Sequence, residues 1–226
     1  MQADALAELR RTSLFGSARD DQLRPLADRA FTRRLAAGQI LFTEGEPSEH
    51  LYVVRSGRVR IVVTSPHGDE FTLTVLGPGD TLGELSVIDG SPRSATAEAL
   101  EPVELLAVGA AEARQVLERE PTVLLAAAAE LAAMVRRLTG NAGDLVFLDL
   151  PRRLAKLLLA EATAGPGGRL RTELGMSQSG LAARLGVTRQ SLNRALSGLT
   201  RRGWIVAEGP VVVVLDAGAL RRFAES

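Results

Sequence analysis

Residues 83–95, GELSVIDGSPRSA, carry the side chains best suited to holding a ligand. Gly83 lets backbone N–H groups at the start of a short helical turn approach an anion closely. Arg93 can give charge-assisted hydrogen bonds to a phosphate, and Ser94 adds a hydroxyl donor. Glu84 is an acceptor that would repel a bare phosphate but can hold a ribose hydroxyl. Together these residues predict a site for a nucleotide rather than for inorganic phosphate.

A second group of functional side chains lies in the stretch LAARLGVTRQSLNRALSGLTRRGWI. Its apolar residues form two helical runs that break at Gly186, which is typical of a helix-turn-helix. Thr188 can cap the second helix, while Arg189, Gln190 and Arg194 point away from the packing face, where a recognition helix reads base edges. The runs WIV and VVVVLD that follow predict a hairpin, so we expect the unit to be winged.

The charge of the chain is unevenly distributed. Residues 150–226 hold 12 basic and 5 acidic residues, a net charge of +7, which leaves −7 on residues 1–149. Residues 174–207 contain 5 arginines and no acid, the pattern expected of a surface that faces phosphates. We therefore expect the two parts to have different partners, with double-stranded DNA the partner of the basic part.

Composition excludes several other chemistries. The chain has no cysteine and only two histidines, His50 and His67, so thiolate zinc sites and iron-sulfur clusters are excluded, and a cupin-type metal site lacks its ligands. Walker, Rossmann and Gly-x-Ser-x-Gly motifs are absent. We expect no catalytic residue, no metal and no required cofactor; a phosphodiesterase-like or cupin-like enzyme is the alternative from another class. The lack of a signal peptide or a long apolar window predicts a cytoplasmic protein without a membrane partner.

Residues 31–108 are rich in short β-type runs separated by glycine-containing turns. In HLYVVRSGRVRIVV, for example, two such runs flank Ser56-Gly57, as in a hairpin. The number and spacing of these runs predict a small antiparallel, jelly-roll-like domain.

Beyond residue 110 the apolar residues follow helical spacing and form one stripe, which comprises Leu117, Leu124, Ala128, Leu131, Val135, Leu138, Ala142 and Leu145. A stripe this long suits either packing on the chain's own domain or pairing with a second copy of the helix, and the spacing alone slightly favours the first. Gly140, Asn141 and Gly143 then lower the helix propensity, and Asp149 with Pro151 marks a new helix start over residues 150–162. Residues 140–149 are therefore a candidate hinge.

The segments GEL and RSAT resemble the phosphate-binding cassette of cyclic-nucleotide-binding domains. With the helix-turn-helix, the chain resembles the CRP/FNR family of bacterial transcription regulators, from AAGQILFTEGEPSEHLYVVRSGRVRI through FLDLPRRLAKLLL to GVTRQSLNRALSGLTRRGWI. The resemblance implies an α+β fold: an amino-terminal double-stranded β-helix (jelly roll) cyclic-nucleotide-binding domain in residues 1–110, a long dimerisation helix with hinge in residues 111–149, and a carboxy-terminal winged helix-turn-helix DNA-binding domain in residues 150–226. The apolar stripe would then face a second copy, which reverses the preference given by spacing.

The resemblance also implies an effector, cAMP or another cyclic nucleotide. It assigns the ribose 2′-hydroxyl to Glu84, the cyclic phosphate to Arg93 and Ser94, the phosphate turn to Gly83 and Leu85, and one wall of the base pocket to Leu73. Where the family contacts adenine with two polar residues of the dimer helix, this chain has Leu138 and Thr139. Only Thr139 can reach the base edge. A constitutive regulator, or one that binds another ligand in an altered pocket, is the alternative.

For DNA, the resemblance places Arg189, Gln190 and Arg194 where the family reads bases with Arg, Glu and Arg. Arginine pairs bidentately with guanine, and the exchange of a carboxylate for an amide moves the preferred partner from cytosine toward adenine or a phosphate. The expected phosphate contacts are Thr188, Ser191, Arg201 and Arg202. The implied partners are a palindromic operator, a second copy of the chain, and RNA polymerase, for which the loop TAGPGG is the candidate surface by family position.

Overall fold

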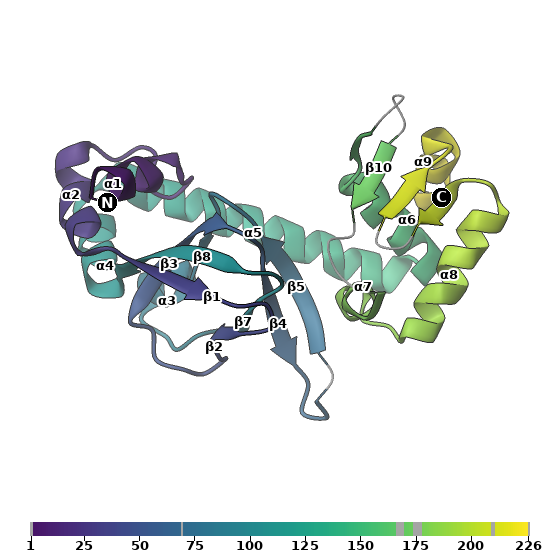
Figure 1. Ribbon diagram of the computed structural model, residues 1–226, viewed down its shortest axis with the longest axis horizontal. Coiled ribbons are helices and arrows are strands. Elements are labelled where there is room, and N and C mark those ends of the chain that lie inside the picture. The colour runs from purple at the N-terminus through teal and green to yellow at the C-terminus, as the bar shows by residue number, and fades with distance from the viewer. Residues whose placement is uncertain (1, 69, 166–169, 174–177, 209–210, 226) are drawn as a thin grey trace. The chain divides into compact units, whose positions relative to one another are not determined.

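The computed structural model describes residues 2–68, 70–165, 170–173, 178–208 and 211–225. The chain forms two compact units, one of Met1–His67 and Leu73–Arg136, the other of Gly68–Thr72 and Arg137–Ser226. Strands dominate the first unit and helices the second, and the long helix α5 contributes to both (Figure 1). The predicted α+β class, with a β-rich amino-terminal part, a long helix and a carboxy-terminal helix-turn-helix, is confirmed.

Two four-stranded sheets, in the orders β1-β8-β3-β6 and β2-β7-β4-β5, are described in the amino-terminal part of the chain; they belong to the first unit except for the first three residues of β5. Neighbouring strands pair antiparallel, as the registers of β3 with β8 and of β4 with β7 show. The strand bounds are β1 Phe31–Leu35, β2 Ile40–Phe42, β3 His50–Ser56, β4 Val59–Thr64, β5 Glu70–Leu76, β6 Thr81–Leu82, β7 Thr96–Ala99 and β8 Val103–Gly109. The hairpin predicted around Ser56-Gly57 is not formed: this turn, where Gly57 has φ +78°, joins β3 to β4, and each of these strands pairs within a different sheet.

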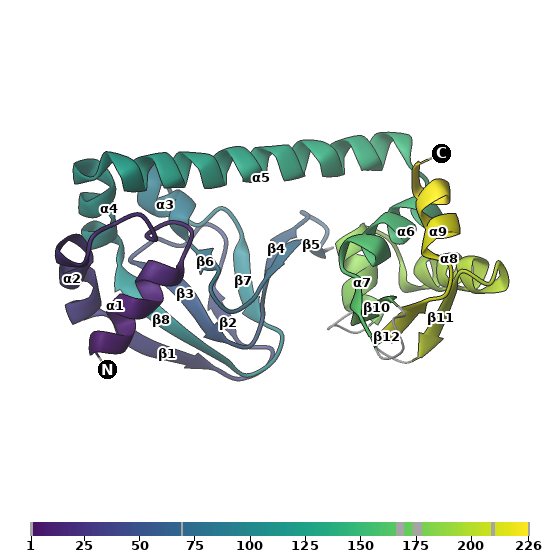
Figure 2. The ribbon, with the colours of Figure 1, turned by 90° about the horizontal axis from the view of Figure 1, so that it is seen from above.

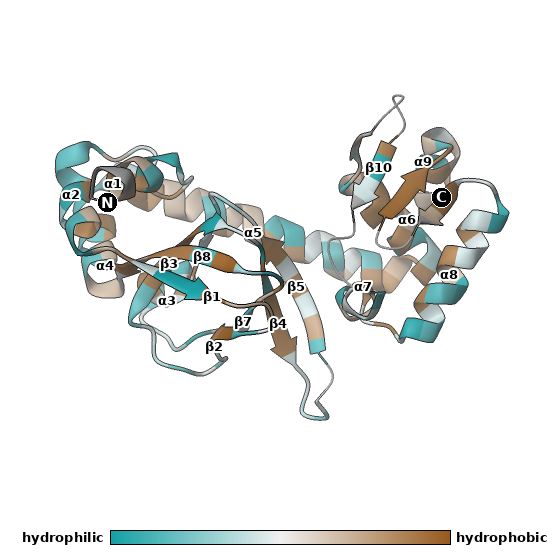
Figure 3. Cartoon of the chain, in the orientation of Figure 1, coloured by the Kyte–Doolittle hydropathy of each residue, from teal (hydrophilic) through white to brown (hydrophobic). Residues whose placement is uncertain are grey.

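Alternation of side chains along the central strands gives the first unit two apolar cores. Val54 of β3 and Leu105 of β8 belong to the cluster between the sheets, which also takes Phe42 from β2. Their neighbours in the chain, Val53 and Leu106, point to the opposite face and join a second cluster. Figure 3 shows β8 as largely hydrophobic and the edge strand β1 as hydrophilic, which suits an edge that meets water.

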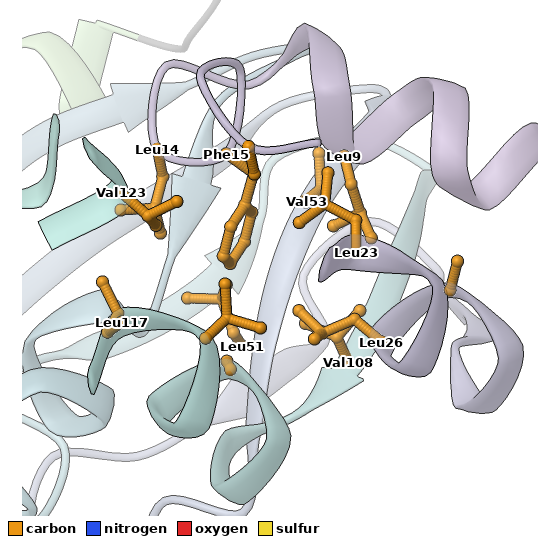
Figure 4. Packing of buried hydrophobic residues seen from close by; sticks show 14 of the residues in the cluster. Leu9, Leu14, Phe15, Leu23, Leu26, Leu51, Val53, Val108, Leu117 and Val123 are labelled. Carbon is orange, nitrogen blue, oxygen red and sulfur yellow. The ribbon is translucent and has the colours of Figure 1, made fainter. Parts of the chain in front are cut away.

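Helices cover the outer face of the sheet that contains β3 and β8. They are α1 (Gln2–Arg11), α2 (Asp20–Arg29), α3 (Glu84–Asp89), α4 (Ala110–Arg119) and the beginning of α5 (Pro121–Phe147). Phe15, which is fully buried, lies among Leu51, Leu117 and Val123, so the segment after α1, the sheet and the helices α4 and α5 share one core (Figure 4). This core fixes α3 and α4 on the β-sheet unit.

Helix α5 differs from the prediction at both ends. The stripe was expected to begin at Leu117, but that residue lies in α4 and is buried, since the chain leaves the helix at Glu120 and starts α5 with Pro121. Gly140 and Gly143 do not interrupt α5, which runs unbroken to Phe147 (Figure 2). Two glycines cost about 2 kcal/mol of helix propensity, too little to break a 27-residue helix.

The end of α5 is set by the start of the next helix, α6 (Leu150–Ala160), whose N-cap Asp149 accepts a hydrogen bond from the backbone N–H of Arg152 at 3.0 Å. The predicted capping role of Asp149 is thus confirmed. The non-helical part of the candidate hinge is restricted to Leu148 and Asp149. No helix in the described part of the chain has the length and apolar character that a membrane span needs.

The second unit packs α6, α7 (Gln178–Leu185), α8 (Arg189–Arg201) and α9 (Ala217–Glu225) on a sheet of order β11-β12-β10-β9. The strands are β9 Thr163–Ala164, β10 Leu170–Glu173, β11 Ile205–Glu208 and β12 Val211–Val214. β11 pairs antiparallel with β12, as expected of a wing; residues 209–210 between these strands and residues 166–168 of the loop TAGPGG lie outside the described residues. Buried leucines of α6, α7 and α8 form one core with Ile205 and Val212.

Candidate ligand site and nucleic-acid interface

The turn between β6 and α3 is built around Gly83. As the N-cap of α3, Gly83 has φ 89° and ψ 10°, a left-handed conformation that favours glycine. A Cβ at this position would overlap Nη1 of Arg93. The sequence therefore needs glycine here for two reasons, the backbone conformation and the close approach of a guanidinium group.

Arg93 is the charged group of this site, although only 4% of its surface is exposed. Its Nη2 donates to the carbonyl of His50 at 2.6 Å, and its Nη1 donates to the carbonyl of Gly83 at 3.3 Å. The guanidinium lies over the ring of Phe42, with Cζ 4.1 Å from the centroid, and 5.8 Å from the ring of Tyr52. Burial lowers the pKa of Arg93, but the guanidinium of an arginine in a protein stays charged.

The backbone of Arg93 is fixed as well. Its N–H donates to the carbonyl of Glu46 at 2.9 Å, and its carbonyl accepts from Gly45 N–H at 2.8 Å. Nε of Arg93 is buried and has no hydrogen-bond partner among the described residues. A buried cation with an unused donor, held beside a glycine turn, is an arrangement that an anion would complete.

Glu84 follows Gly83 as the first residue of α3 and is half-buried. Burial raises the pKa of its carboxyl above the ordinary value of 4.5; the nearby Glu130 of α5 raises this pKa too, whereas Arg93 lowers it. Ser13, in the segment after α1, donates a hydrogen bond to Glu130. The site thus pairs a buried cation with a partly buried acceptor, as a ligand with both a negative charge and hydroxyl donors requires.

The other predicted ligand residues lie as follows. Leu85 of α3 and Leu73 of β5 are half-buried, and Ser94 is exposed beside Arg93. Thr139 is an exposed residue of α5 in the second unit. The structure therefore brings Gly83, Glu84 and Arg93 together, and the ligand-binding roles of all seven residues stay predictions.

Sequence reasoning missed the groups that hold Arg93 in place. Phe42 and Tyr52 stack on each other, with centroids 6.1 Å apart, and both face the guanidinium. His50 is half-buried against Phe31, and its carbonyl accepts a hydrogen bond from Arg93. The one sequence feature that could have pointed to Tyr52 is that it is the single tyrosine of the chain.

The second unit presents the predicted recognition helix. Gly186, with φ 64°, forms the turn between α7 and α8, and Thr188 is the N-cap of α8. Its Oγ1 accepts from the N–H of Ser191 at 3.2 Å and donates to Ser191 Oγ at 3.0 Å. The predicted capping role of Thr188 is thus confirmed.

One face of α8 is buried and the other meets solvent. Leu192, Ala195, Leu196 and Leu199 are buried in the core of the second unit. Arg189, Gln190 and Arg194 are exposed. This is the amphipathic arrangement in which a helix offers its polar side chains to the groove of a duplex.

The two arginines at the end of α8 differ in their surroundings. Arg201 is exposed. Arg202 lies over two rings of its own unit, with Cζ 5.0 Å from the centroid of Trp204 and 4.8 Å from that of Phe223. Arg202 therefore ties α8 to α9 by cation–π contacts, and Arg201 is the better candidate for a phosphate contact.

A metal-dependent site finds no support in the described part of the chain, where no three or more His, Cys, Asp or Glu side chains lie close enough together to hold a metal ion.

Comparison with known proteins gives a consistent result for both units. Residues 32–120 match the cyclic nucleotide-binding domain family, and residues 152–223 match the Crp-like helix-turn-helix domain family. The CRP-like cAMP-activated global transcriptional regulator of Mycobacterium tuberculosis is 36% identical over 208 residues, which cover 88% of this chain and 93% of that protein.

The cyclic AMP receptor protein of Thermus thermophilus is 36% identical over 191 residues, 84% of this chain and 86% of that protein. Among solved structures, a transcriptional regulator of the CRP family from Thermus thermophilus superposes with a TM-score of 0.69 at 28% identity, over 86% of this chain and 97% of that one.

Proposed function

Because this chain belongs to the CRP/FNR family of transcription regulators, we propose that it is a homodimeric, cytoplasmic operator-binding protein whose DNA affinity is controlled by a cyclic nucleotide, cAMP first among the candidates. The observation that carries the proposal is the buried, charged Arg93 with its unused Nε beside the left-handed turn at Gly83. Of the relatives that align over most of this chain, one is named as cAMP-activated and another as a cyclic AMP receptor.

In the proposed complex the residues of the site have distinct tasks. Arg93 and Ser94 bind the cyclic phosphate and the turn at Gly83 and Leu85 surrounds it, while Glu84 accepts a hydrogen bond from the ribose 2′-hydroxyl. Leu73 covers the base, and Thr139 of α5 contacts its edge. No catalytic step is assigned to any of these side chains, since a regulator needs only to bind its effector.

Control of DNA binding is proposed to work by a shift between two states of the dimer. A nucleotide that binds one state better raises the population of that state. Helix α5 links the ligand site to α6 and the helix-turn-helix, and the recognition helices of two chains must lie about one DNA turn apart to read a palindrome. The nucleotide is expected to favour that spacing, and RNA polymerase is the expected partner of the DNA-bound dimer.

The test of ligand binding is a calorimetric titration of protein shown by mass spectrometry to carry no nucleotide, with cAMP, cyclic GMP and cyclic di-GMP in separate experiments. Saturable binding of cAMP at one site per chain is the expected result. If none of the three nucleotides gives a heat of binding or competes with the others for the protein, the proposed ligand class is overturned.

Dimer formation is proposed to use the exposed stripe of α5. Leu124 and Val135 are 51% and 60% exposed in the single chain, although both are apolar. Changing Val135 to glutamate is expected to convert the dimer into a monomer of 24.0 kDa by light scattering at micromolar concentration, because the dimer would bury two unpaired carboxylates.

The matched control for this change is Ala129→Glu. It adds the same side chain at an exposed position about 120° away around the helix. This variant should remain dimeric. A dimeric V135E, or a monomeric wild-type protein, would contradict the assignment of the interface.

Nucleotide affinity should decrease on acidification. Glu84 accepts from the ribose more strongly as a carboxylate than as a carboxylic acid, and its raised pKa means that it takes up a proton at a higher pH than an ordinary glutamate. The affinity for cAMP is therefore expected to be constant at high pH and to fall as the pH is lowered through the pKa of Glu84, which lies above that of an ordinary glutamate. In Glu84→Gln, whose amide does not titrate, the affinity should be lower and should not change with pH; a pH profile in E84Q equal to that of the wild type would exclude Glu84 as the titrating acceptor.

A constitutive regulator is the second candidate, and one observation favours it. The Nη groups of Arg93 already donate to the carbonyls of His50 and Gly83, so the guanidinium is partly satisfied without a ligand. Such a protein would bind its operator equally well with and without nucleotide.

A further inference from the structure

Helix α3 is held at its carboxyl end by Arg114 of α4. Nε of Arg114 donates to the carbonyl of Val87 at 2.8 Å, and Nη2 donates to the carbonyl of Ser86 at 3.3 Å. The carbonyl of Ser86 also accepts from the N–H of Gly90 at 3.0 Å, so Arg114 adds a second donor there and gives the carbonyl of Val87 a donor from outside the helix. Through these bonds Arg114 joins α3 to α4.

The end of α3 fits closely around this side chain. Gly90, the C-cap, has φ 77°, and a Cβ at this position would lie 3.0 Å from Nη2 of Arg114. Val87 is 1% exposed and belongs to the same core as Ala113 and Val116 of α4. Polar and apolar contacts therefore both connect the two helices.

The opposite end of α3 is the ligand site. Gly83 and Glu84 stand at its amino end, and Arg93 lies against Gly83. Because α3 has only 6 residues, its two ends cannot move independently without breaking its few hydrogen bonds. A displacement of the Gly83 turn is thus expected to reach the carbonyls that Arg114 holds.

Helix α4 in turn leads directly to α5. The carbonyl of Glu120, the C-cap of α4, accepts hydrogen bonds from the N–H groups of Val123 and Leu124 of α5, both at 3.0 Å. At its other end, α4 starts at Ala110, whose N–H donates to the carbonyl of Glu49 next to the Arg93 acceptor His50. The amino end of α4 is therefore hydrogen-bonded beside the ligand site, and its carboxyl end is hydrogen-bonded to α5.

We propose that Arg114 is a positioning residue that couples occupancy of the ligand site to helix α5. Arg114 does not touch the nucleotide; it transmits the position of α3 to α4. This inference rests on the proposed function, because it concerns the step between nucleotide binding and the change in DNA affinity.

The experiment measures the coupling factor, defined as the ratio of operator dissociation constants without and with saturating cAMP, for the full-length dimer at fixed salt. The first variant, Arg114→Met, keeps about the length of the side chain and removes its N–H donors. The second, Arg114→Lys, keeps the positive charge and can donate to one of the two carbonyls. Arg119→Met is the control, because Arg119 is an exposed residue of the same helix.

In R114M the coupling factor is expected to fall at least about five-fold, from a value that for allosteric proteins is commonly about 5 to 150. Operator affinity without nucleotide should stay unchanged, R114K should recover part of the coupling, and R119M should equal the wild type. Saturating cAMP removes any effect that a weaker nucleotide affinity alone would have. A lower melting temperature with an unchanged ratio would mean a structural role only.

Two results would overturn the inference, and they are distinguishable. If the wild type responds to cAMP and R114M responds equally, Arg114 does not couple the sites, and the proposed function stands. If the wild type neither binds cAMP nor changes its DNA affinity, the proposed function fails and the inference falls with it.

Discussion

Replacing Arg93 by alanine is expected to weaken cAMP binding by at least about 100-fold, because two charge-assisted hydrogen bonds to the phosphate, each worth about 1.5–3 kcal/mol, are lost. Calorimetric titration of the variant and the wild type measures the effect. Arg93 also stacks on Phe42 and bonds two backbone carbonyls, so the melting temperature must be recorded for each variant.

Two further variants keep this prediction testable. Arg93→Lys retains the charge but not the fork geometry, and its affinity should lie between those of the wild type and the alanine variant. Arg119→Ala, an exposed arginine of α4, should bind cAMP normally. A folded R93A with wild-type affinity would remove Arg93 from the site and favour the constitutive regulator.

Replacing Arg189 by alanine should remove most of the sequence-specific DNA binding. A bidentate contact from arginine to guanine discriminates by about 1–3 kcal/mol, and in a dimer both half-sites lose it. The affinity for an operator selected from a random pool is therefore expected to approach the affinity for unrelated DNA. Fluorescence anisotropy with both duplexes, at the same salt concentration, measures the ratio.

Arg201→Ala is the matched comparison. A phosphate contact carries no sequence information, so this change should weaken binding to both duplexes equally and reduce the salt dependence. Selection with Gln190→Glu should move the preferred base from adenine to cytosine at the position read by Gln190. An R189A protein that still distinguishes its operator would show that α8 does not read bases through Arg189.

The β-sheet unit could be predicted because its strands alternate. Val53 and Val54 point to opposite faces of the sheet, and each face packs in a separate hydrophobic core. The helix caps at Asp149 and Thr188 could be predicted because the side-chain acceptor and the N–H that it binds are only three residues apart. Such features depend on neighbours in the chain.

Two features of the helices were mispredicted for local reasons. The step from Leu117 to Leu124 fits a heptad, so the stripe seemed continuous, although Pro121 marks the start of a new helix. The glycines in α5 suggested a break, but helix propensity is weak compared with the hydrogen bonds of a long helix.

The surroundings of Arg93 and Arg114 could not be predicted, because their partners are distant in the sequence. The carbonyl of His50 lies 43 residues from Arg93, and Val87 lies 27 residues from Arg114. Backbone carbonyls have no sequence signature. The residue types of the ligand site were therefore readable from the sequence, but the contacts that orient them were not.

A cyclic nucleotide is proposed to change the DNA affinity of the dimer. Fluorescence anisotropy of a labelled operator with nucleotide-free protein, at fixed salt, with and without saturating cAMP, tests this most directly. A rise in operator affinity of about 5- to 150-fold, without an equal rise for unrelated DNA, is the predicted result. An operator affinity that is the same with and without cAMP would contradict the account.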